Sequence, residues 1–305
     1  MTKTIKVVKW LVLAILALLA LSILFYTYLV WSFDTENFPD NHGNVDTELF
    51  VGDGNNQPLL VGLGGAEGGN AWASNYWAAQ RDEFISQGYA FLALGYFGAE
   101  NTPLELDRIA LEGVYNAILQ AAENPAVNAQ CIALIGGSKG AELALLLASE
   151  YPDIKAVVAM APGSAVFAAL TMAMNTPSFS LNGEPLPFVP VPMSATPALL
   201  QGDLRGAWVE MMKNEEAMAA AAIPVENING PIFFVSAARD EFWPSTEMSQ
   251  SMQQRLEDNN FPHHVEHLAT EDDHASVLNH FDEVETFLRN HFLDASAPAS
   301  CSTRG

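Results

Sequence analysis

The chain has 305 residues, of which 50% are hydrophobic, and its 13 basic and 36 acidic residues give a formal charge of -23. A charge of this sign repels nucleic acid and anionic lipid, so the composition argues against a nucleic-acid binder. The length and the apolar content suffice for one large α/β domain with a full core. The two cysteines, Cys131 and Cys301, do not suggest a disulfide framework, and we expect Cys131 to be a packed thiol in an apolar strand.

The first predicted element is an apolar helix near the N-terminus. Residues 10–31 form a run of 22 residues without a charged side chain, which is long enough to cross a bilayer. The run is longer than the apolar region of a cleaved signal peptide, which favours an uncleaved single-pass membrane anchor over residues 1–33. Lysines precede the run and acidic residues follow it, so the positive-inside rule predicts an extracytoplasmic catalytic domain, periplasmic in a bacterium. The lysines are Lys3, Lys6 and Lys9, and the acidic residues are Asp34, Glu36 and Asp40.

Residues 34–43 read as a polar linker, residues 44–293 as one catalytic domain, and residues 294–305 as a disordered tail. Within the domain, unbroken apolar runs alternate with helical segments, which is typical of parallel strands covered by helices on both faces. We therefore predict a doubly wound, mostly parallel α/β sheet. The expected strands are Asp46–Gly54 with its turn, Pro58–Leu63, Tyr89–Leu94, Cys131–Ile135, Ile154–Met160, Pro231–Ala237 and His263–Leu268, and the expected helices are Trp72–Gln87, Leu104–Glu123, Ala141–Ser149, Thr246–Asn259 and Ala275–Phe292.

The alternation stops at about residues 162–230, which we predict to be a lid insertion. Six prolines make its first part irregular, and Asp203–Ala222 reads as one helix rich in Met and Ala. An insertion of this size after a strand is expected to cover the catalytic edge and to contact substrate. Its methionines could line an adaptable apolar pocket, although core packing explains each one equally well. The methionines are Met172, Met174, Met193, Met211, Met212 and Met218.

The pattern Gly-x-Ser-x-Gly at residues 136–140 follows an apolar strand and opens an apolar helix. Glycines on both sides of the serine let the backbone make a sharp turn, which exposes the serine oxygen at the edge of the sheet. The first NH groups of the helix point at the same space, where they stabilise negative charge. We therefore predict Ser138 to be a nucleophile, with a simple helix N-cap as the alternative.

A serine nucleophile needs a base, and an imidazole base needs a carboxylate that fixes its tautomer. In serine hydrolases of this type the order along the chain is Ser, acid, His. Asp240 is the first acidic residue after the strand that ends at Ala237, so it belongs at the carboxyl edge of that strand. We predict Asp240 to be the acid, and its rivals are Glu241, Asp272 and Asp273.

His274 is the predicted base among the seven histidines of the chain. It follows a loop after the last predicted strand and precedes the last predicted helix, so it satisfies both the chain order and the edge of the sheet. A histidine exposed on the surface is the alternative. Of the other histidines, His263, His264 and His267 are expected on the strand, His280 and His291 on the last helix, and His42 in the linker.

The oxyanion hole is predicted from backbone NH groups of Gly65 or Ala66, in the loop after the second strand, together with that of Lys139. A dinucleotide loop is a competing interpretation, but Glu67 stands where the third glycine of that motif belongs. The sequence lacks the helical His-Glu-x-x-His frame or the cysteine partner that a zinc site would need. We therefore expect no metal and no organic cofactor. The zinc alternative would use His264 and His267 with Glu266 or Asp273, and the dinucleotide alternative would use Gly62, Gly64 and Glu100.

Four groups of residues carry a resemblance to a known family. They are Tyr96–Gly98, Gly137–Ala144, Ala222–Glu226 with Gly230–Ile232, and Asp240 with Trp243–Ser245. Together they resemble the C-terminal catalytic domain of acyl-CoA thioesterases and bile acid-CoA:amino acid N-acyltransferases, a branch of the α/β-hydrolase superfamily close to dienelactone hydrolases. The similarity covers about residues 55–292. It implies an α/β-hydrolase fold with Ser138 as nucleophile, Asp240 as acid and His274 as base. The acyltransferase branch uses a cysteine nucleophile, so the serine is similar to the hydrolytic branch.

These patterns predict a membrane-anchored serine hydrolase that acts on a small-molecule carboxylic ester or acyl thioester through an acyl-enzyme. Two alternatives stay open, acyl transfer to an amine or alcohol acceptor and a binding protein built on a hydrolase scaffold. The acyl group, the leaving group and the oligomeric state do not follow from the sequence.

Overall fold

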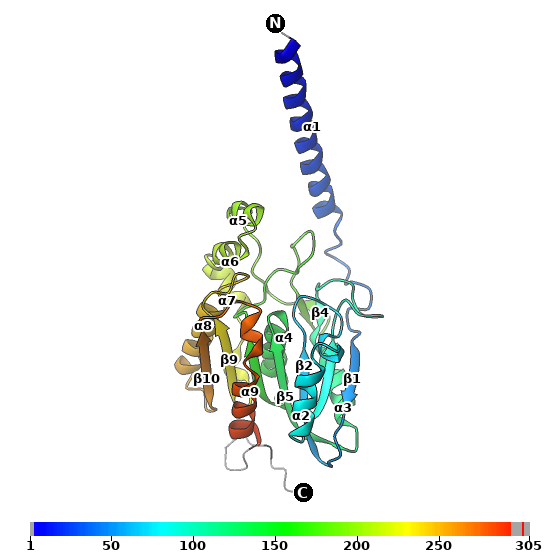
Figure 1. The fold of residues 1–305 in the computed structure, drawn as a ribbon, viewed down its shortest axis with the longest axis vertical. Helices are drawn as coiled ribbons and strands as arrows, with labels where there is room; N and C mark the ends of the chain where they lie inside the picture. The colour runs from blue at the N-terminus through cyan, green and yellow to red at the C-terminus, as the bar shows by residue number, and fades with distance from the viewer. Residues whose placement is uncertain (1–2, 294–300, 302–305) are drawn as a thin grey trace.

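The computed structural model describes residues 3–293 and residue 301. Its larger sheet has seven strands in the order β1-β3-β2-β5-β6-β9-β10, in which β1 is antiparallel to β3 and the other neighbours are parallel (Figure 1). The predicted mostly parallel sheet is therefore confirmed. The strands are β1 (Asp46–Phe50), β2 (Gln57–Leu63), β3 (Ala90–Gly95), β5 (Val127–Gly137), β6 (Ile154–Met160), β9 (Ile232–Ala237) and β10 (Val265–Thr270).

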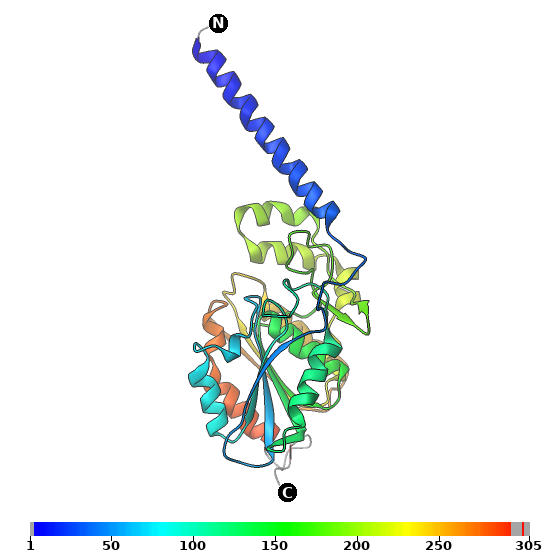
Figure 2. The same ribbon diagram turned by 90° about the vertical axis from the view of Figure 1, so that its right-hand side faces the viewer.

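Helices cover both faces of this sheet (Figures 1 and 2). Apolar side chains of α3, α4 and α8 share one core cluster with Leu59, Val61 and Leu63 of β2. Those of α2 and α9 share a second cluster with Leu60 of the same strand. Because alternate side chains of one strand enter opposite cores, the strands read as unbroken apolar runs. The helices are α2 (Ala78–Ser86), α3 (Leu111–Ala122), α4 (Lys139–Glu150), α8 (Ser245–Asp258) and α9 (Phe281–Phe287).

Several predicted helices are shorter than expected, and the last strand begins two residues later. The helix expected from Leu104 begins at Leu111, because the backbone NH of Arg108 donates to the carbonyl of Pro177 and starts a short strand, β4 (Ile109–Ala110). The helix expected over Trp72–Gln87 is a 3-10 turn (Ala71–Ala73) followed by α2. The helix expected over Ala275–Phe292 is broken into a 3-10 turn (Ser276–Asn279), α9 and a π-helical end (Leu288–Leu293). His263 and His264 precede β10 instead of lying on it.

The lid segment, residues 162–230, contributes two strands to a small three-stranded sheet and contains three α-helices. The sheet pairs β4 with β7 (Phe179–Leu181) and β7 with β8 (Glu184–Pro185). The single helix expected over Asp203–Ala222 is wrong, because Asn214 accepts a hydrogen bond from the NH of Ala217 and starts a new helix. The helices are α5 (Thr196–Gln201), α6 (Leu204–Met212) and α7 (Glu215–Ala221).

Cys131 and Cys301 form a disulfide with a Cα–Cα distance of 5.3 Å, which corrects the expectation of a packed thiol in β5. The backbone NH of Cys301 also donates to the carbonyl of Phe292, so residue 301 lies back against the domain. The pair is 170 residues apart in the chain, and that spacing carries no information about proximity in space. The rest of the predicted tail, residues 294–305, lies outside the described residues.

Helix α1 (Lys3–Ser32) projects away from the domain (Figure 1). Its segment Ile5–Ser32 has a mean hydropathy of 2.7 over its most apolar window, and none of that window is buried against the domain. The helix is long and apolar enough to cross a membrane, a property that signal sequences share.

Candidate active site

Ser138 lies on the turn between β5 and α4, at the carboxyl edge of the sheet. Its backbone has φ 54° and ψ -119°, a left-handed conformation that is costly for a residue with a side chain. Its NH donates to the carbonyl of Met160 at 2.8 Å, which fixes the turn against the neighbouring strand β6. The side chain makes no capping hydrogen bond to α4, so the N-cap alternative does not account for it.

The glycines of this turn are required by close backbone approach. A Cβ atom on Gly136 would overlap the carbonyl of Gly140, and one on Gly140 would lie 2.5 Å from the carbonyl oxygen of Leu63 in β2. Both positions therefore exclude a side chain. The turn that presents Ser138 is thus fixed by residues on both sides of the serine.

Asp240 and His274 come together at the same edge. Nδ1 of His274 lies 2.8 Å from Oδ1 of Asp240, whose side chain is fully buried. The same oxygen accepts hydrogen bonds from the backbone NH groups of Phe242 and Trp243 at 3.0 and 3.2 Å. An ionised carboxylate only accepts hydrogen bonds, so Nδ1 of the neutral ring carries the proton and Nε2 is left as an acceptor.

The rival carboxylates have other partners. Glu241 accepts a hydrogen bond from the backbone NH of His274 at 3.0 Å, so it binds the loop and not the ring. Asp272 lies 2.7 Å from Nε2 of His280, and Asp273 accepts a bond from a backbone NH three residues later. Of these acids, Asp240 is the one in contact with the His274 imidazole. The role of Glu241 was not visible in the sequence, because it depends on the path of a distant loop.

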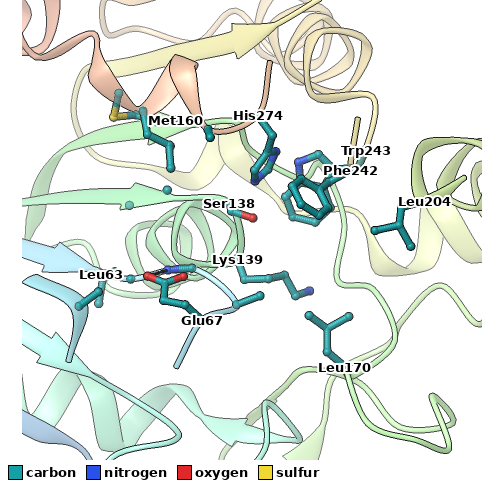
Figure 3. Close-up of a pocket in the computed structure, with 18 of the residues that line it drawn as sticks. Leu63, Glu67, Ser138, Lys139, Met160, Leu170, Leu204, Phe242, Trp243 and His274 are labelled. Carbon is teal, nitrogen blue, oxygen red and sulfur yellow. Dashed lines mark hydrogen bonds between the residues drawn. The ribbon is translucent and has the colours of Figure 1, made fainter. Parts of the chain in front are cut away.

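Ser138 and His274 line one cavity of about 470 Å³. Figure 3 shows both side chains facing this space, with Leu170 and Leu204 of the lid segment across it. Most of the lining is apolar, which suits a hydrocarbon chain. Of the predicted pocket methionines, Met174 and Met211 line the cavity, whereas Met172 and Met193 are exposed and Met212 and Met218 pack against the core of the lid segment.

The predicted oxyanion residues Gly65, Ala66 and Lys139 all line this cavity beside Ser138. A Cβ atom on Gly65 would lie 3.3 Å from the Cβ of Ser138, so the two backbones are in close contact. The NH of Gly65, however, donates to Oε1 of Glu67 at 3.0 Å. Gly65 and Glu67 are close in sequence. The conformation of a glycine-rich loop does not follow from its sequence, however, so this contact could not be predicted.

The Lys139 side chain forms a buried ion pair that the sequence analysis did not identify. Its Nζ lies 2.8 Å from Oε2 of Glu142, one turn further along α4. Burial lowers the pKa of Lys139 and raises that of Glu142, and the mutual attraction of the pair opposes both shifts. Oε1 of Glu142 is buried without a hydrogen-bond partner in the part of the chain that the structure describes. The spacing i, i+3 on a helix is the signal that could have found the pair.

The other histidines lie away from the cavity lining. His267 contacts Ser236 Oγ at 2.8 Å and Gln253 Oε1 at 3.1 Å, and burial lowers its pKa. Both ring nitrogens of His267 therefore contact residues other than His264. The structure does not bring His264 and His267 together as the zinc alternative requires. A different surface group could hold an ion, because single ligand atoms of His264, Glu266 and His291 lie within 4.8 Å of one another.

Packing within the protein accounts for the first glycine of the dinucleotide alternative. A Cβ atom on Gly62 would lie 2.7 Å from the ring of Trp72, which fills the space beside β2. Gly62 is therefore needed for contact with an aromatic ring of the protein itself, and the glycine is explained without a cofactor.

Comparison with known proteins places the chain in a family. Residues 109–273, more than half of the chain, match the family described as "BAAT / Acyl-CoA thioester hydrolase C terminal". Mouse peroxisomal succinyl-coenzyme A thioesterase is 28% identical over 220 residues, which are 72% of this chain and 49% of that protein. Mouse acyl-coenzyme A thioesterase 6 is 29% identical over 221 residues, again 72% and 49% of the two chains. The chain thus spans about half the length of these relatives.

Among solved structures, Pyrococcus horikoshii acylaminoacyl peptidase superposes with a TM-score of 0.58 at 14% identity, over 80% of this chain and 39% of that one. This similarity concerns the fold, which is that of an α/β hydrolase. The resemblance inferred from the four groups of residues is confirmed by the family match, and the chain belongs to the BAAT / acyl-CoA thioester hydrolase C-terminal family.

Proposed function

We propose that this protein is a serine hydrolase that cleaves carboxylic esters or acyl thioesters through a Ser138–His274–Asp240 triad. The observation that carries the proposal is the contact between His274 Nδ1 and Asp240 Oδ1 at the edge where the Ser138 turn opens into the same cavity. Family membership supports it, because the relatives named above are acyl-CoA thioesterases.

In the acylation step, Nε2 of His274 takes the proton from Ser138 Oγ, and Oγ forms a bond to the acyl carbonyl carbon. Asp240 holds the imidazole in the required tautomer and stabilises the imidazolium that results. The bond to the leaving oxygen or sulfur then breaks, and that atom takes the proton from Nε2. The acyl group stays on Ser138, with its chain in the apolar cavity.

In the deacylation step, His274 takes a proton from water, whose oxygen attacks the acyl carbon and releases the acid while Ser138 regains its proton. The oxyanion of both steps lies next to the NH of Lys139 at the N-terminus of α4 and the NH of Ala66. The NH of Gly65 joins them only if Glu67 Oε1 leaves it, since the two are 3.0 Å apart.

A fluorophosphonate probe with full-length protein in detergent tests the proposal directly. We expect covalent labelling of Ser138 and no labelling of the Ser138→Ala variant. The same protein should hydrolyse p-nitrophenyl esters or acyl-CoA thioesters, and comparing the two substrate series identifies the leaving group. An unlabelled wild-type protein with an intact fold would mean that the scaffold binds ligands without catalysis.

Acyl transfer to an amine or alcohol is the second candidate, because an acyl-enzyme can react with an acceptor other than water. The serine at position 138 favours hydrolysis, since the acyltransferase branch has cysteine there. The two activities separate when amine or alcohol acceptors are added during turnover. Hydrolysis predicts that free acid stays the main product, whereas transfer predicts that the acceptor outcompetes water.

We further propose that residues 1–33 anchor the chain in a membrane, that residues 34–43 link the anchor to a catalytic domain of residues 44–293, and that this domain is extracytoplasmic. Lysines before the apolar helix and acidic residues after it support this orientation. The Cys131–Cys301 disulfide supports it as well, because disulfides persist in oxidising compartments. A reporter fused after Gly305 should be active only outside the cytoplasm, and activity inside would reverse the orientation.

A further inference from the structure

The junction between α1 and the domain is fixed by one buried arginine. Arg108 is 2% exposed, and its guanidinium donates to the carbonyls of Asp34 at 2.8 Å and Thr35 at 3.1 Å. The guanidinium is also paired with Asp107 at 2.9 Å. Helix α1 ends at Ser32, so a single residue separates the helix from the first clamped carbonyl. One residue spans at most about 3.5 Å, and the domain therefore lies directly against the end of α1.

The lid segment occupies the same end of the domain. Both views show α5 and α6 beside the point from which α1 leaves, with the larger sheet beyond them (Figures 1 and 2). Several apolar side chains on this segment are exposed. A single exposed apolar residue is ordinary on a protein surface, but several at one end of a domain are not. They include Leu170 at 39%, Met172 at 63%, Met193 at 85% and Leu200 at 84% exposure.

The cavity opens through this exposed apolar surface. Leu170 and Leu204 of the lid segment line the cavity and are more than one third exposed, as is Phe242 in the turn after β9, so these three residues mark its mouth. Ser138 lies on the opposite wall of the same cavity (Figure 3). An apolar route therefore runs from the end of the domain beside α1 to the nucleophile.

We propose that the lid segment lies in the interface of the bilayer that α1 enters, and that the cavity takes its acyl substrate from that bilayer and not from water. The inference rests on the proposed function, whose substrate class it narrows to lipid-soluble acyl esters or thioesters. The lid segment carries two basic and six acidic residues, so its attraction to the membrane is apolar and not electrostatic. Zwitterionic lipid is accordingly sufficient for docking.

Full-length protein in phosphatidylcholine nanodiscs provides the test. A triple variant, Met172→Glu, Met193→Glu and Leu200→Glu, changes exposed side chains that do not line the cavity. We expect hydrolysis of p-nitrophenyl palmitate dissolved in the bilayer to fall about tenfold or more, because burial of these side chains in the interface is lost. Hydrolysis of water-soluble p-nitrophenyl acetate should stay within about twofold of wild type.

Val51→Glu is the matched control, because Val51 is 45% exposed and directly follows Phe50, which pairs with Phe91 at the amino edge of the sheet, opposite the catalytic turns. It should leave both activities unchanged. If the triple variant cleaves bilayer palmitate as well as wild type does, the inference is wrong. If neither ester is cleaved by wild-type protein, the proposed function fails instead.

A photoactivatable phosphatidylcholine with a diazirine on its acyl chain gives a readout that does not depend on turnover. We expect cross-links in residues 170–204 in addition to α1, and their loss from that segment in the triple variant. Cross-links confined to α1 in the wild-type protein would overturn the inference even if the enzyme is active.

Discussion

The cavity has two walls that are built in different ways. One wall, here the catalytic wall, is formed by turns that leave parallel strands. Its buried acid is held in place, because Asp240 Oδ1 contacts three donors, the backbone NH groups of Phe242 and Trp243 and Nδ1 of His274. The other, the lid wall, comes from short elements of residues 162–230, and α5 contributes no buried residue at all. The first wall suits chemistry that needs fixed geometry, and the second suits adaptable contact with an acyl chain.

The largest effect is expected on the catalytic wall, from Asp240→Asn. The amide can no longer hold the required tautomer of His274, and a comparable change in a serine protease costs about 10⁴-fold in kcat. We expect a loss of about 10³–10⁴-fold in kcat/KM for short and long acyl esters alike, measured with p-nitrophenyl substrates.

Glu241→Gln is the matched control for that change. Glu241 binds the backbone NH of His274 and not its ring, and glutamine keeps an oxygen that can accept this bond, so the substitution should cost no more than about tenfold. Equal losses in the two variants would mean that the acid has been assigned to the wrong residue.

The second effect concerns the buried Lys139–Glu142 ion pair in α4, the helix that follows Ser138. Glu142→Ala leaves the Lys139 ammonium buried without its partner, and breaking a buried pair in this way costs about 3–5 kcal/mol. We expect the free energy of unfolding in urea to fall by that amount. The double variant Lys139→Met with Glu142→Leu removes both charges and should recover most of the loss; a double variant as unstable as Glu142→Ala would show that the charges are not the cause.

The catalytic wall was predictable from sequence because its signals are local. A strand, a glycine-flanked serine and a helix adjoin in the chain, and parallel strands must bring their carboxyl ends to one edge, where Asp240 and His274 follow. The fold followed from the same alternation of apolar runs and helices. The family match then confirmed what those residues resemble.

The lid wall was not predictable in detail because tertiary contacts decide it. The segment around Arg108 is held by the carbonyl of Pro177, nearly 70 residues away, and not by helix formation. The helix breaks at Asn214 because its side chain caps a new helix. The surrounding residues favour a helix throughout, so the sequence did not indicate this break. The Cys131–Cys301 disulfide is of the same kind, since chain separation does not reveal which cysteines meet.

The third prediction tests the lid wall with Trp208→Ala. Trp208 lines the cavity, with its ring 4.7 Å from that of Phe167 and 5.6 Å from that of Trp243. Loss of apolar contact is worth about 1–3 kcal/mol in binding, so KM for a long-chain ester should rise about tenfold or more. Kinetics with p-nitrophenyl acetate should change little; equal effects on both esters would make Trp208 part of the catalytic wall instead.

The smallest effect is expected from the pair His280 and Asp272, which lie on either side of His274. The distance between His280 Nε2 and Asp272 Oδ2 is 2.7 Å. The hydrogen bond with Asp272 raises the pKa of His280, and the same bond lowers the pKa of Asp272. A raised histidine pKa stabilises the fold fully below its unfolded value of about 6.5, and this contribution is lost as pH rises through the folded pKa. The lowered pKa of Asp272 adds stability above about pH 4, which is lost in stronger acid.

His280→Gln should therefore lower Tm more at about pH 5.5 than at about pH 8.5, on either side of the ordinary histidine pKa. Calorimetry at both pH values measures the difference, with His42→Gln as a control outside the loop. His42 stacks on Phe38 in the segment before β1. A Tm loss that is the same at both pH values would show that His280 acts through packing and not through its charge, so the pair would not contribute to holding the catalytic wall.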